Sequence, residues 1–323
     1  MLLPALAILG GFILLVWSAD RFVDGAAATA KHMGLPSLLI GMVIVGFGTS
    51  APEMVVSAMA AMDGNPALAL GNGLGSNIVN ISLVLGATAL IAPMTVHSKI
   101  IQKEIPLLIA ISLLTGFFLW DLSLTFTESL ILLAGFFVIV GWSIYAALNN
   151  KGDALESEFE EELSNAMTLG KAIFWLILGL AVLVGSSRIL VWGSVEIAQQ
   201  FGVSDLIIGL TIVALGTSLP ELAATIVAAK KGEHDIAIGN IIGSNMFNLL
   251  AVIGIAGTIN PMFDLAPEVL WRDWTVMLGL IVALLLMAYG FGRGHKINRI
   301  EGGIFLGVYI AYNAYLIQSI VGA

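Results

Sequence analysis

Long apolar runs alternate with short polar segments along the whole chain of 323 residues. About 20 apolar residues in a helix cross the roughly 30 Å hydrocarbon core of a bilayer, and ten runs suit that length. The ten runs lie at 2–30, 37–62, 67–91, 104–120, 127–148, 169–199, 205–229, 236–259, 274–291 and 301–321. The pattern therefore predicts an all-α polytopic membrane protein with ten transmembrane helices.

The composition supports a bilayer environment. Hydrophobic residues make up 59% of the chain and charged residues only 11%, whereas soluble domains carry about 25% charged residues. The first run, Leu2 to Trp17, has no basic segment before it and no clear cleavage site after it, so we expect a first span and not a signal peptide. The chain contains no cysteine, which excludes disulfides, thiolate metal sites and a cysteine nucleophile.

Basic residues fall almost entirely on one set of alternate connections between the spans. These connections carry Lys31, Lys99, Lys103, Lys151, Lys171, Lys230, Lys231, Arg293, Lys296 and Arg299. The opposite connections carry Arg272 alone. Because cytoplasmic loops are enriched in Lys and Arg, this bias predicts that both termini lie outside the cytoplasm.

The formal net charge of −9 is concentrated in the middle connection, where six acidic residues lie between Asp153 and Glu162. The segment has neither the spacing nor the glycine of an EF-hand calcium loop. We therefore expect residues 151–168 to form a solvated cytoplasmic loop and not a Ca²⁺ sensor.

Two blocks of sequence recur at a constant offset of 168 residues. GMVIVGFGTSAPE at 41–53 matches GLTIVALGTSLPE at 209–221, and GNGLGSNIVN at 71–80 matches GNIIGSNMFN at 239–248. The halves 1–150 and 169–323 hold five predicted spans each, and an odd number inverts the second half relative to the first. Two inverted five-helix repeats are typical of secondary transporters, whose ion sites lie near the midplane where the repeats meet.

Each repeat carries Gly-Thr-Ser-X-Pro-Glu inside an apolar span. Proline donates no backbone hydrogen bond and clashes with the carbonyl four residues earlier, so we expect the helix to be interrupted and carbonyls near Gly48 and Gly216 to be free. Free carbonyls at membrane depth occur where they are enclosed by protein or line an aqueous cavity, and they can bind a hard cation. A Thr and a Glu four residues apart share a face of a near-helical turn. These pairs are Thr49 with Glu53 and Thr217 with Glu221.

The next span of each half supplies a Ser and an Asn four residues apart on one helix face. These pairs are Ser76 with Asn80 and Ser244 with Asn248. Oxygen ligands of this kind suit Na⁺ and Ca²⁺ better than Zn²⁺ or copper. The glycines before them are equally explained by close packing of neighbouring helices.

Glu53 and Glu221 are the centre of the predicted cation site. An ionisable residue inside the membrane is a functional hypothesis by default, and this one recurs in a duplicated motif. The structural alternative is a carboxyl group that is protonated or paired with an arginine. Arg21 and Arg188 lie within the first and sixth spans, although they could extend to an interface instead.

The paired blocks GTSAPE/GTSLPE and GNGLGSNIVN/GNIIGSNMFN closely resemble the two α-repeats of the calcium/cation antiporter superfamily, in particular bacterial inner-membrane Na⁺/Ca²⁺ exchangers. The resemblance covers both halves, the ten-helix count and the short middle loop. It implies alternating access, in which the long first and sixth helices slide across a more rigid eight-helix bundle. The ligands it implies are Thr49, Ser50, Glu53, Ser76, Asn80, Thr217, Ser218, Glu221, Ser244 and Asn248, with backbone carbonyls near Gly46 and Ala214.

One position departs from the pattern of that superfamily. In the sodium-coupled members, one of the four central acidic or amide positions is an aspartate in the second repeat, and here that position is Asn248. The departure leaves the antiporter prediction intact. It leaves open the number of ions moved in each cycle and, to some degree, the coupling ion.

The predicted function is therefore Na⁺/Ca²⁺ antiport across a bacterial inner membrane. A Ca²⁺/H⁺ antiporter of the same superfamily is the alternative, and Thr-Ser hydroxyls in both repeats favour sodium over it. A passive cation channel fits less well, because two near-identical half-sites at the midplane suit an occluded site. The chain has neither a Gly-X-Ser-X-Gly nor a His-Glu-X-X-His motif, so we expect no enzyme activity. We also expect no resident cofactor, no nucleic-acid partner and no requirement for an oligomer.

Overall fold

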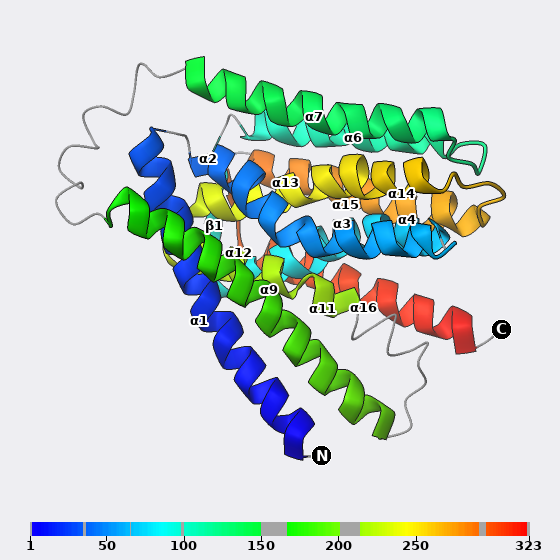
Figure 1. Cartoon of the computed structure of the whole chain (residues 1–323). Coiled ribbons are helices and arrows are strands. Elements are labelled where there is room, and N and C mark those ends of the chain that lie inside the picture. Colours follow the sequence, from blue (N-terminus) through cyan, green and yellow to red (C-terminus); the bar gives the residue numbers. More distant parts are fainter. Residues whose placement is uncertain are drawn as a thin grey trace.

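Helices make up nearly all of the computed structural model, which describes residues 2–34, 37–64, 66–97, 100–149, 167–200, 214–290 and 295–321 (Figure 1). The first repeat contains α1 (Leu2–Met33), α2 (Ser37–Leu39), η1 (Ile40–Val45), α3 (Gly46–Met62), α4 (Pro66–Val79), η2 (Asn80–Leu85), α5 (Gly86–Ile91), β1 (Met94–Thr95), η3 (Ile100–Glu104), α6 (Ile105–Phe118) and α7 (Phe126–Asn149). The second contains α9 (Leu169–Gln200), α11 (Ala214–Thr217), α12 (Leu219–Lys230), α13 (His234–Phe247), η6 (Asn248–Val252), α14 (Ile253–Ile259), η7 (Val269–Trp274), α15 (Thr275–Tyr289), β2 (Lys296–Ile297) and α16 (Arg299–Val321). The η elements are π-helical turns.

Most helices coincide with the predicted spans. Nine helices in the described part of the chain are long and apolar enough to cross a membrane. The remaining predicted span, 205–229, is the seventh along the chain and overlaps residues 201–213, which lie outside the described residues. Its described part is α11 and α12. The acidic run of the predicted middle loop also lies outside them, within residues 150–166.

Two spans begin about one helical turn earlier than the sequence predicts. Each starts with a π-helical turn, η3 or η7, that carries charged residues. These residues interact locally, with Lys103 Nζ 3.7 Å from Glu104 Oε1 and Arg272 Nε 2.6 Å from Asp273 Oδ1. An apolar run ends at such residues even though the helix continues, so the predicted starts at 104 and 274 are wrong.

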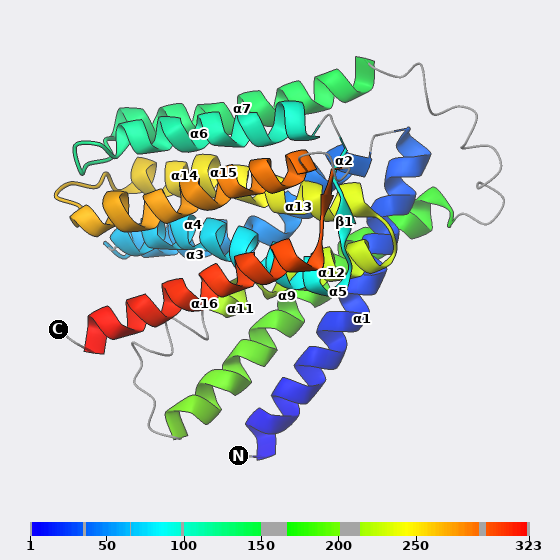
Figure 2. The same ribbon diagram turned by 180° about the vertical axis from the view of Figure 1, so that it is seen from behind.

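The two longest helices, α1 and α9, have 32 residues each and pack side by side, oblique to the remaining helices (Figures 1 and 2). Glycines allow their backbones to approach closely. A Cβ added to Gly11 would lie 3.1 Å from the backbone nitrogen of Leu190, and one added to Gly179 would lie 2.8 Å from the backbone nitrogen of Phe22. The two contacts are related by the offset of 168, so the helix pair has the inverted symmetry of the repeats.

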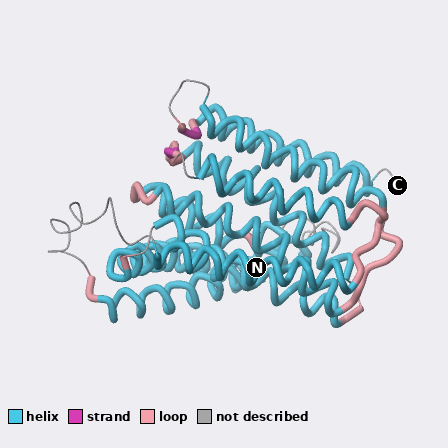
Figure 3. Tube along the Cα trace, turned by 90° about the horizontal axis from the view of Figure 1, so that it is seen from above, coloured by secondary structure: helices cyan, strands magenta, loops and turns pink. Residues whose placement is uncertain are grey.

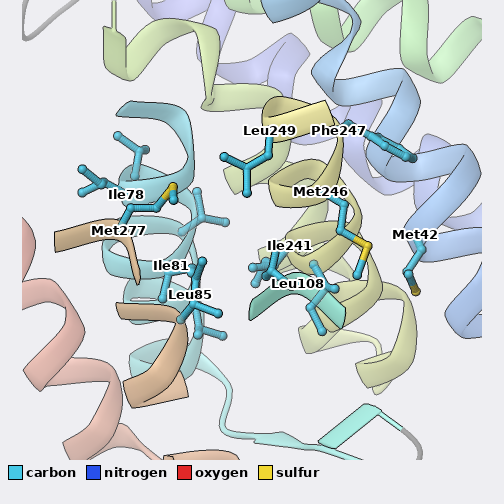
Figure 4. Close-up of a cluster of buried hydrophobic side chains, with 14 of the residues drawn as sticks. Met42, Ile78, Ile81, Leu85, Leu108, Ile241, Met246, Phe247, Leu249 and Met277 are labelled. Atoms are coloured by element: carbon cyan, nitrogen blue, oxygen red, sulfur yellow. The ribbon is translucent and has the colours of Figure 1, made fainter. Parts of the chain in front are cut away.

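The most deeply buried span is the continuous helix formed by α13, η6 and α14, whose apolar stretch is entirely buried. Its side chains Ile241, Met246 and Leu249 lie among other buried apolar residues of both repeats (Figure 4). The outer helices α7, α9 and α16 instead expose large apolar side chains, such as Phe137 and Ile304. An apolar exterior around a buried centre is the arrangement expected of a membrane bundle.

Two short β contacts join one repeat to the other, and each uses the segment that follows the second motif of one repeat. β1 pairs with β2 in antiparallel orientation, with Met94 opposite Ile297, and Figure 3 shows these strands at one end of the bundle. An isolated bridge joins Leu124 to Met262. Met94 and Met262 are again 168 residues apart, so equivalent segments of the two repeats make these contacts.

Candidate cation site

The duplicated motifs meet in the interior of the bundle. GTSAPE lies on α3 and GTSLPE on α11 and α12, while the two Ser-Asn pairs lie on α4–η2 and α13–η6. α3 contacts α13 of the other repeat, and α11 contacts α4 in the same way. Nine of the ten predicted side-chain ligands are buried, and Thr217 is half-buried. The fold thus brings both halves of the predicted site together.

Three hydrogen bonds link the two repeats at this centre. Ser50 Oγ donates to Glu221 Oε1 over 3.2 Å. Thr49 Oγ1 donates to Asn240 Oδ1 over 3.1 Å, and Ser244 Oγ donates to the carbonyl oxygen of Gly46 over 3.5 Å. Since each bond crosses between repeats, the two half-sites form one polar centre.

Five buried oxygens of the predicted ligands have no hydrogen-bond partner among the described residues. They are Glu53 Oε2, Asn80 Oδ1, Ser218 Oγ, Glu221 Oε2 and Asn248 Oδ1. A buried polar group without a partner costs about 1–3 kcal/mol, and more when it is charged. Both repeats supply these five oxygens to one region of the bundle. The arrangement indicates a binding site for a cation that is coordinated by oxygen atoms.

A π-helical turn begins at each of the two asparagines, Asn80 in η2 and Asn248 in η6. Such turns interrupt the regular hydrogen-bond ladder of a helix and are frequent at functional sites. Their symmetric placement puts the same backbone irregularity beside both halves of the centre. Hydrophobic periodicity gave no signal for it.

The predicted interruption at the proline motif is wrong for the first repeat. α3 continues as a helix through Thr49 and Glu53 with Pro52 inside it, and the irregular turn lies earlier, in η1. In the second repeat the helix does stop, because Ser218 separates α11 from α12 with φ −91° and ψ 6°. Proline still leaves the carbonyl four residues earlier without its usual amide donor, so a helical backbone and a free carbonyl at Gly48 are compatible.

Sequence reasoning missed a pair of supporting asparagines. Asn72 Nδ2 donates to Ser57 Oγ over 2.9 Å and to the Glu53 carbonyl over 3.3 Å. Its equivalent, Asn240, donates to Thr225 Oγ1 over 2.8 Å and to the Glu221 carbonyl over 3.4 Å. Both asparagines follow the first glycine of the repeated GN block, and that recurrence was the signal that could have identified them.

In the described part of the chain, neither Glu53 nor Glu221 is paired with an arginine. Within the described ranges, the ion pairs involve other side chains than Glu53 and Glu221. Arg21 instead lies over the ring of Trp175, 5.5 Å from its centroid. Among the described residues, no arginine neutralises either carboxylate.

The resemblance implies two backbone ligands, the carbonyls at Gly46 and Ala214, and the contacts of only the first are described. The Gly46 carbonyl lies at the centre, where it accepts from Ser244 Oγ. Ala214 begins α11, directly after residues that lie outside the described ones. As a whole, the centre offers two carboxylates, two amide oxygens, hydroxyls and at least one carbonyl, which is a donor set for a hard cation.

Comparisons with known proteins cover both repeats. A family model described as sodium/calcium exchanger protein matches residues 3–145 and 171–318. The chain is 48% identical over 321 residues to CaxA of Alkalimonas amylolytica, covering 99% of this chain and 100% of that protein. It is 38% identical to inner membrane protein YrbG of Escherichia coli K12, covering 98% of this chain and 97% of that protein.

A solved structure agrees over the same length. The sodium-calcium exchanger NCX_Mj, soaked with 10 mM Na⁺ and zero Ca²⁺, matches with a TM-score of 0.83 and 30% identity, covering 97% of this chain and 98% of that chain. Other matching structures of the same exchanger were soaked with Ca²⁺ or Sr²⁺. The predicted fold class, two inverted repeats of membrane helices, is confirmed.

Proposed function

The chain belongs to the sodium/calcium exchanger protein family, and we propose that it exchanges Na⁺ for Ca²⁺ at a site formed by Glu53 and Glu221. Membership makes it an integral membrane antiporter. The observation that carries the proposal is the group of five buried oxygens without partners, two of them carboxylate oxygens, at the meeting point of the repeats. These oxygens bind either cation in turn.

Charge counting supports exchange at one shared site. Glu53 is 1% exposed and Glu221 is 2% exposed, and isolated buried charges cost several kcal/mol each. One Ca²⁺ or two Na⁺ would neutralise two carboxylates. Because both loads use the same oxygens, binding of one excludes the other, and this exclusion couples the two fluxes.

The hydroxyl groups favour sodium over protons as the coupling ion. A proton carrier needs the carboxylates alone, whereas this centre adds Thr49, Ser50, Ser218 and Ser244 as oxygen ligands. The likeness to an exchanger that was soaked with Na⁺, Ca²⁺ and Sr²⁺ supports the same pair of cations here.

The basic connections support one orientation in the membrane. In it, both termini lie outside the cytoplasm and the predicted middle loop, 151–168, lies inside. The inner membrane is the proposed location, in keeping with the name of the Escherichia coli relative.

Purified protein in sealed vesicles tests the coupling ion. Vesicles preloaded with Na⁺ and diluted into sodium-free buffer containing radioactive Ca²⁺ should accumulate Ca²⁺, whereas an imposed pH gradient without Na⁺ should produce no uptake above empty vesicles. Uptake driven by the pH gradient alone would replace the proposal with Ca²⁺/H⁺ antiport.

Orientation is tested with single cysteines, because the chain has none of its own. Asp121 and Lys296 are exposed residues on opposite sets of connections. In intact cells stripped of their outer membrane, an impermeant maleimide should label D121C and should label K296C only after lysis. Labelling of both before lysis would contradict the inverted topology.

A further inference from the structure

An ion pair fastens α1 to the end of α12. Lys231 Nζ lies 2.7 Å from Asp20 Oδ1 and 2.6 Å from Asp24 Oδ1, and it also donates to the Asp20 carbonyl over 3.1 Å. Lys231 is the C-cap residue of α12, the helix that carries Glu221. The two aspartates lie one turn apart on α1. This cluster therefore joins a long oblique helix directly to a helix of the cation site.

The other repeat carries the same pair with its signs exchanged. The offset of 168 relates Asp20 to Arg188 on α9, and it relates Asp63 at the end of α3 to Lys231. In the first pair the long helix carries the acid, Asp20, and the helix end carries the base, Lys231. In the second pair the long helix carries the base, Arg188, and the helix end carries the acid, Asp63. Either arrangement gives an attractive pair.

The local structure confirms that these positions are equivalent. Two residues before Asp20 and Arg188, Ser18 and Ser186 each donate to the carbonyl three residues earlier, over 3.1 and 3.0 Å. At the helix ends, Asp63 and Lys231 are both C-cap residues. Each is followed by a glycine with φ +80°. The correspondence therefore rests on matched conformation as well as on residue numbers.

Arg188 and Asp63 are apart in this conformation. Arg188 lines a mostly apolar cavity of about 880 Å³ between α9, α7 and α3, whose α3 wall includes Gly48 and Val55. Asp63 is exposed beyond that wall, at the end of α3. None of the ion pairs found among the described residues includes either side chain. The equivalent surface of the other repeat is closed, because α1 packs along α12.

We propose that the two pairs are alternating latches: the Arg188–Asp63 pair forms when the Lys231 pair with Asp20 and Asp24 opens. In an inverted-repeat antiporter, the two access states arise when one group of helices moves against the rest of the fold around a fixed site. Exchanging the conformations of the two halves moves α1 off the end of α12 and brings α9 onto the end of α3. The five side chains are positioning residues, since they set which state is populated and do not touch the cation.

The two latches are unequal. The position equivalent to Asp24 is Trp192, so Lys231 has two carboxylates whereas Arg188 has one. The latch that is closed in this structure therefore has one more carboxylate than the other latch. An arginine inside a membrane span is costly unless it is paired, and pairing with Asp63 gives Arg188 that partner in the second state.

Cysteine cross-linking tests the latch without any ion gradient, so its outcome is independent of whether Na⁺ or H⁺ is the coupling ion. In membranes, D63C/R188C should be joined by a short bifunctional methanethiosulfonate, and the cross-link should arrest exchange until a reductant is added. Adding Lys231→Met should raise the cross-linking rate several-fold, because it opens the first latch. Lys230→Met, a change at the exposed neighbour, is the matched control and should leave the rate unchanged.

Swapping the charged side chains at positions 63 and 188 provides an independent test. Asp63→Arg and Arg188→Asp should each lower the exchange rate several-fold, and the double variant D63R/R188D should restore it. Restoration supports the pair even where the cross-linker fails to reach. Absence of restoration together with absence of a cross-link overturns the proposal, and so does a cross-linking rate that Lys231→Met leaves unchanged.

Discussion

The two halves of the cation site carry the same motif but hold it differently. In the first repeat α3 runs through GTSAPE as one helix, whereas in the second the chain leaves helical geometry at Ser218. Ser50 donates to Glu221, while Ser218 Oγ has no hydrogen-bond partner among the described residues. Equal sequences in unequal conformations are what a site requires if it opens to each side of the membrane in turn.

The two halves of the site should contribute equally through their carboxylates. Loss of either carboxylate should have the largest effect on Ca²⁺ transport. Glu53→Gln and Glu221→Gln each leave one charge facing a divalent cation. Breaking a buried charge pair costs about 3–5 kcal/mol, so we expect Ca²⁺ transport to fall by roughly two to four orders of magnitude for either variant, measured in vesicles.

Glu128→Gln is the matched control for that comparison. Glu128 accepts from the backbone and hydroxyl of Thr125 at the start of α7, away from the site, and its change should leave transport near the parent rate. A strong defect in one glutamate variant beside near-normal transport in the other would mean that the halves do not share one site.

The two asparagines Asn80 and Asn248 make the central charge symmetric, and a carboxylate at either position would break that symmetry. With two carboxylates and two amides, two Na⁺ balance one Ca²⁺, so we expect exchange by the parent protein to be insensitive to membrane potential. Asn248→Asp adds a third negative charge and favours a third Na⁺. One net charge per cycle couples transport to voltage by about 2.3 kcal/mol per 100 mV.

Flux at two potassium-valinomycin potentials measures this difference. The ratio of Na⁺-driven Ca²⁺ flux at the two potentials should be close to one for the parent and should rise clearly for Asn248→Asp. A parent rate that changes steeply in the direction of positive charge entering with sodium would favour three Na⁺ per Ca²⁺ and contradict the charge count.

The supporting asparagines Asn72 and Asn240 sharpen the comparison further. Each fixes the backbone of its glutamate, but Asn240 also accepts from Thr49 of the other repeat. Replacement by alanine leaves buried groups unsatisfied at about 1–3 kcal/mol. We expect a loss of roughly tenfold in Ca²⁺ affinity for Asn72→Ala and a larger loss for Asn240→Ala. Asn313→Ala, which removes only a bond to the Tyr309 carbonyl, should have no effect.

The two serines should differ, and Ser218→Ala should have the smallest effect. Ser50→Ala removes a hydrogen bond to a carboxylate, which contributes about 1.5–3 kcal/mol, and Ser218→Ala removes a hydroxyl without such a bond. We expect the apparent Ca²⁺ affinity to fall roughly tenfold for Ser50→Ala and less for Ser218→Ala, measured by flux against external Ca²⁺. The reverse order would show that the second half of the site carries more of the binding.

The spans and the site could be predicted because both depend on residue type at regular spacing. Apolar runs located the helices, and the duplication at an offset of 168 identified Glu53 and Glu221 as a pair. The continuity of α3 could not be predicted, because a proline inside a helix is tolerated when neighbouring helices and ligands satisfy the freed backbone groups. The starts of η3 and η7 were missed because charged residues end an apolar run without ending a helix.

Contacts between distant residues were also beyond the sequence. The roles of Asn72 and Asn240 depend on the packing of one helix on the next, and hydrophobic periodicity carries no information about it. The opposite charges of the equivalent residues Asp20 and Arg188 were visible in the sequence. The sequence did not show that Asp20 forms an ion pair with Lys231, and the structure does.

Equilibrium Ca²⁺ binding to the purified protein, titrated with Na⁺, tests the central claim most directly. The account predicts one Ca²⁺ bound per chain, displaced by Na⁺ in direct competition, and no measurable binding to the double variant E53Q/E221Q with its fold intact by circular dichroism. Ca²⁺ binding that survives in the double variant, or that Na⁺ fails to displace, would contradict a single carboxylate site shared by the two repeats and the two cations.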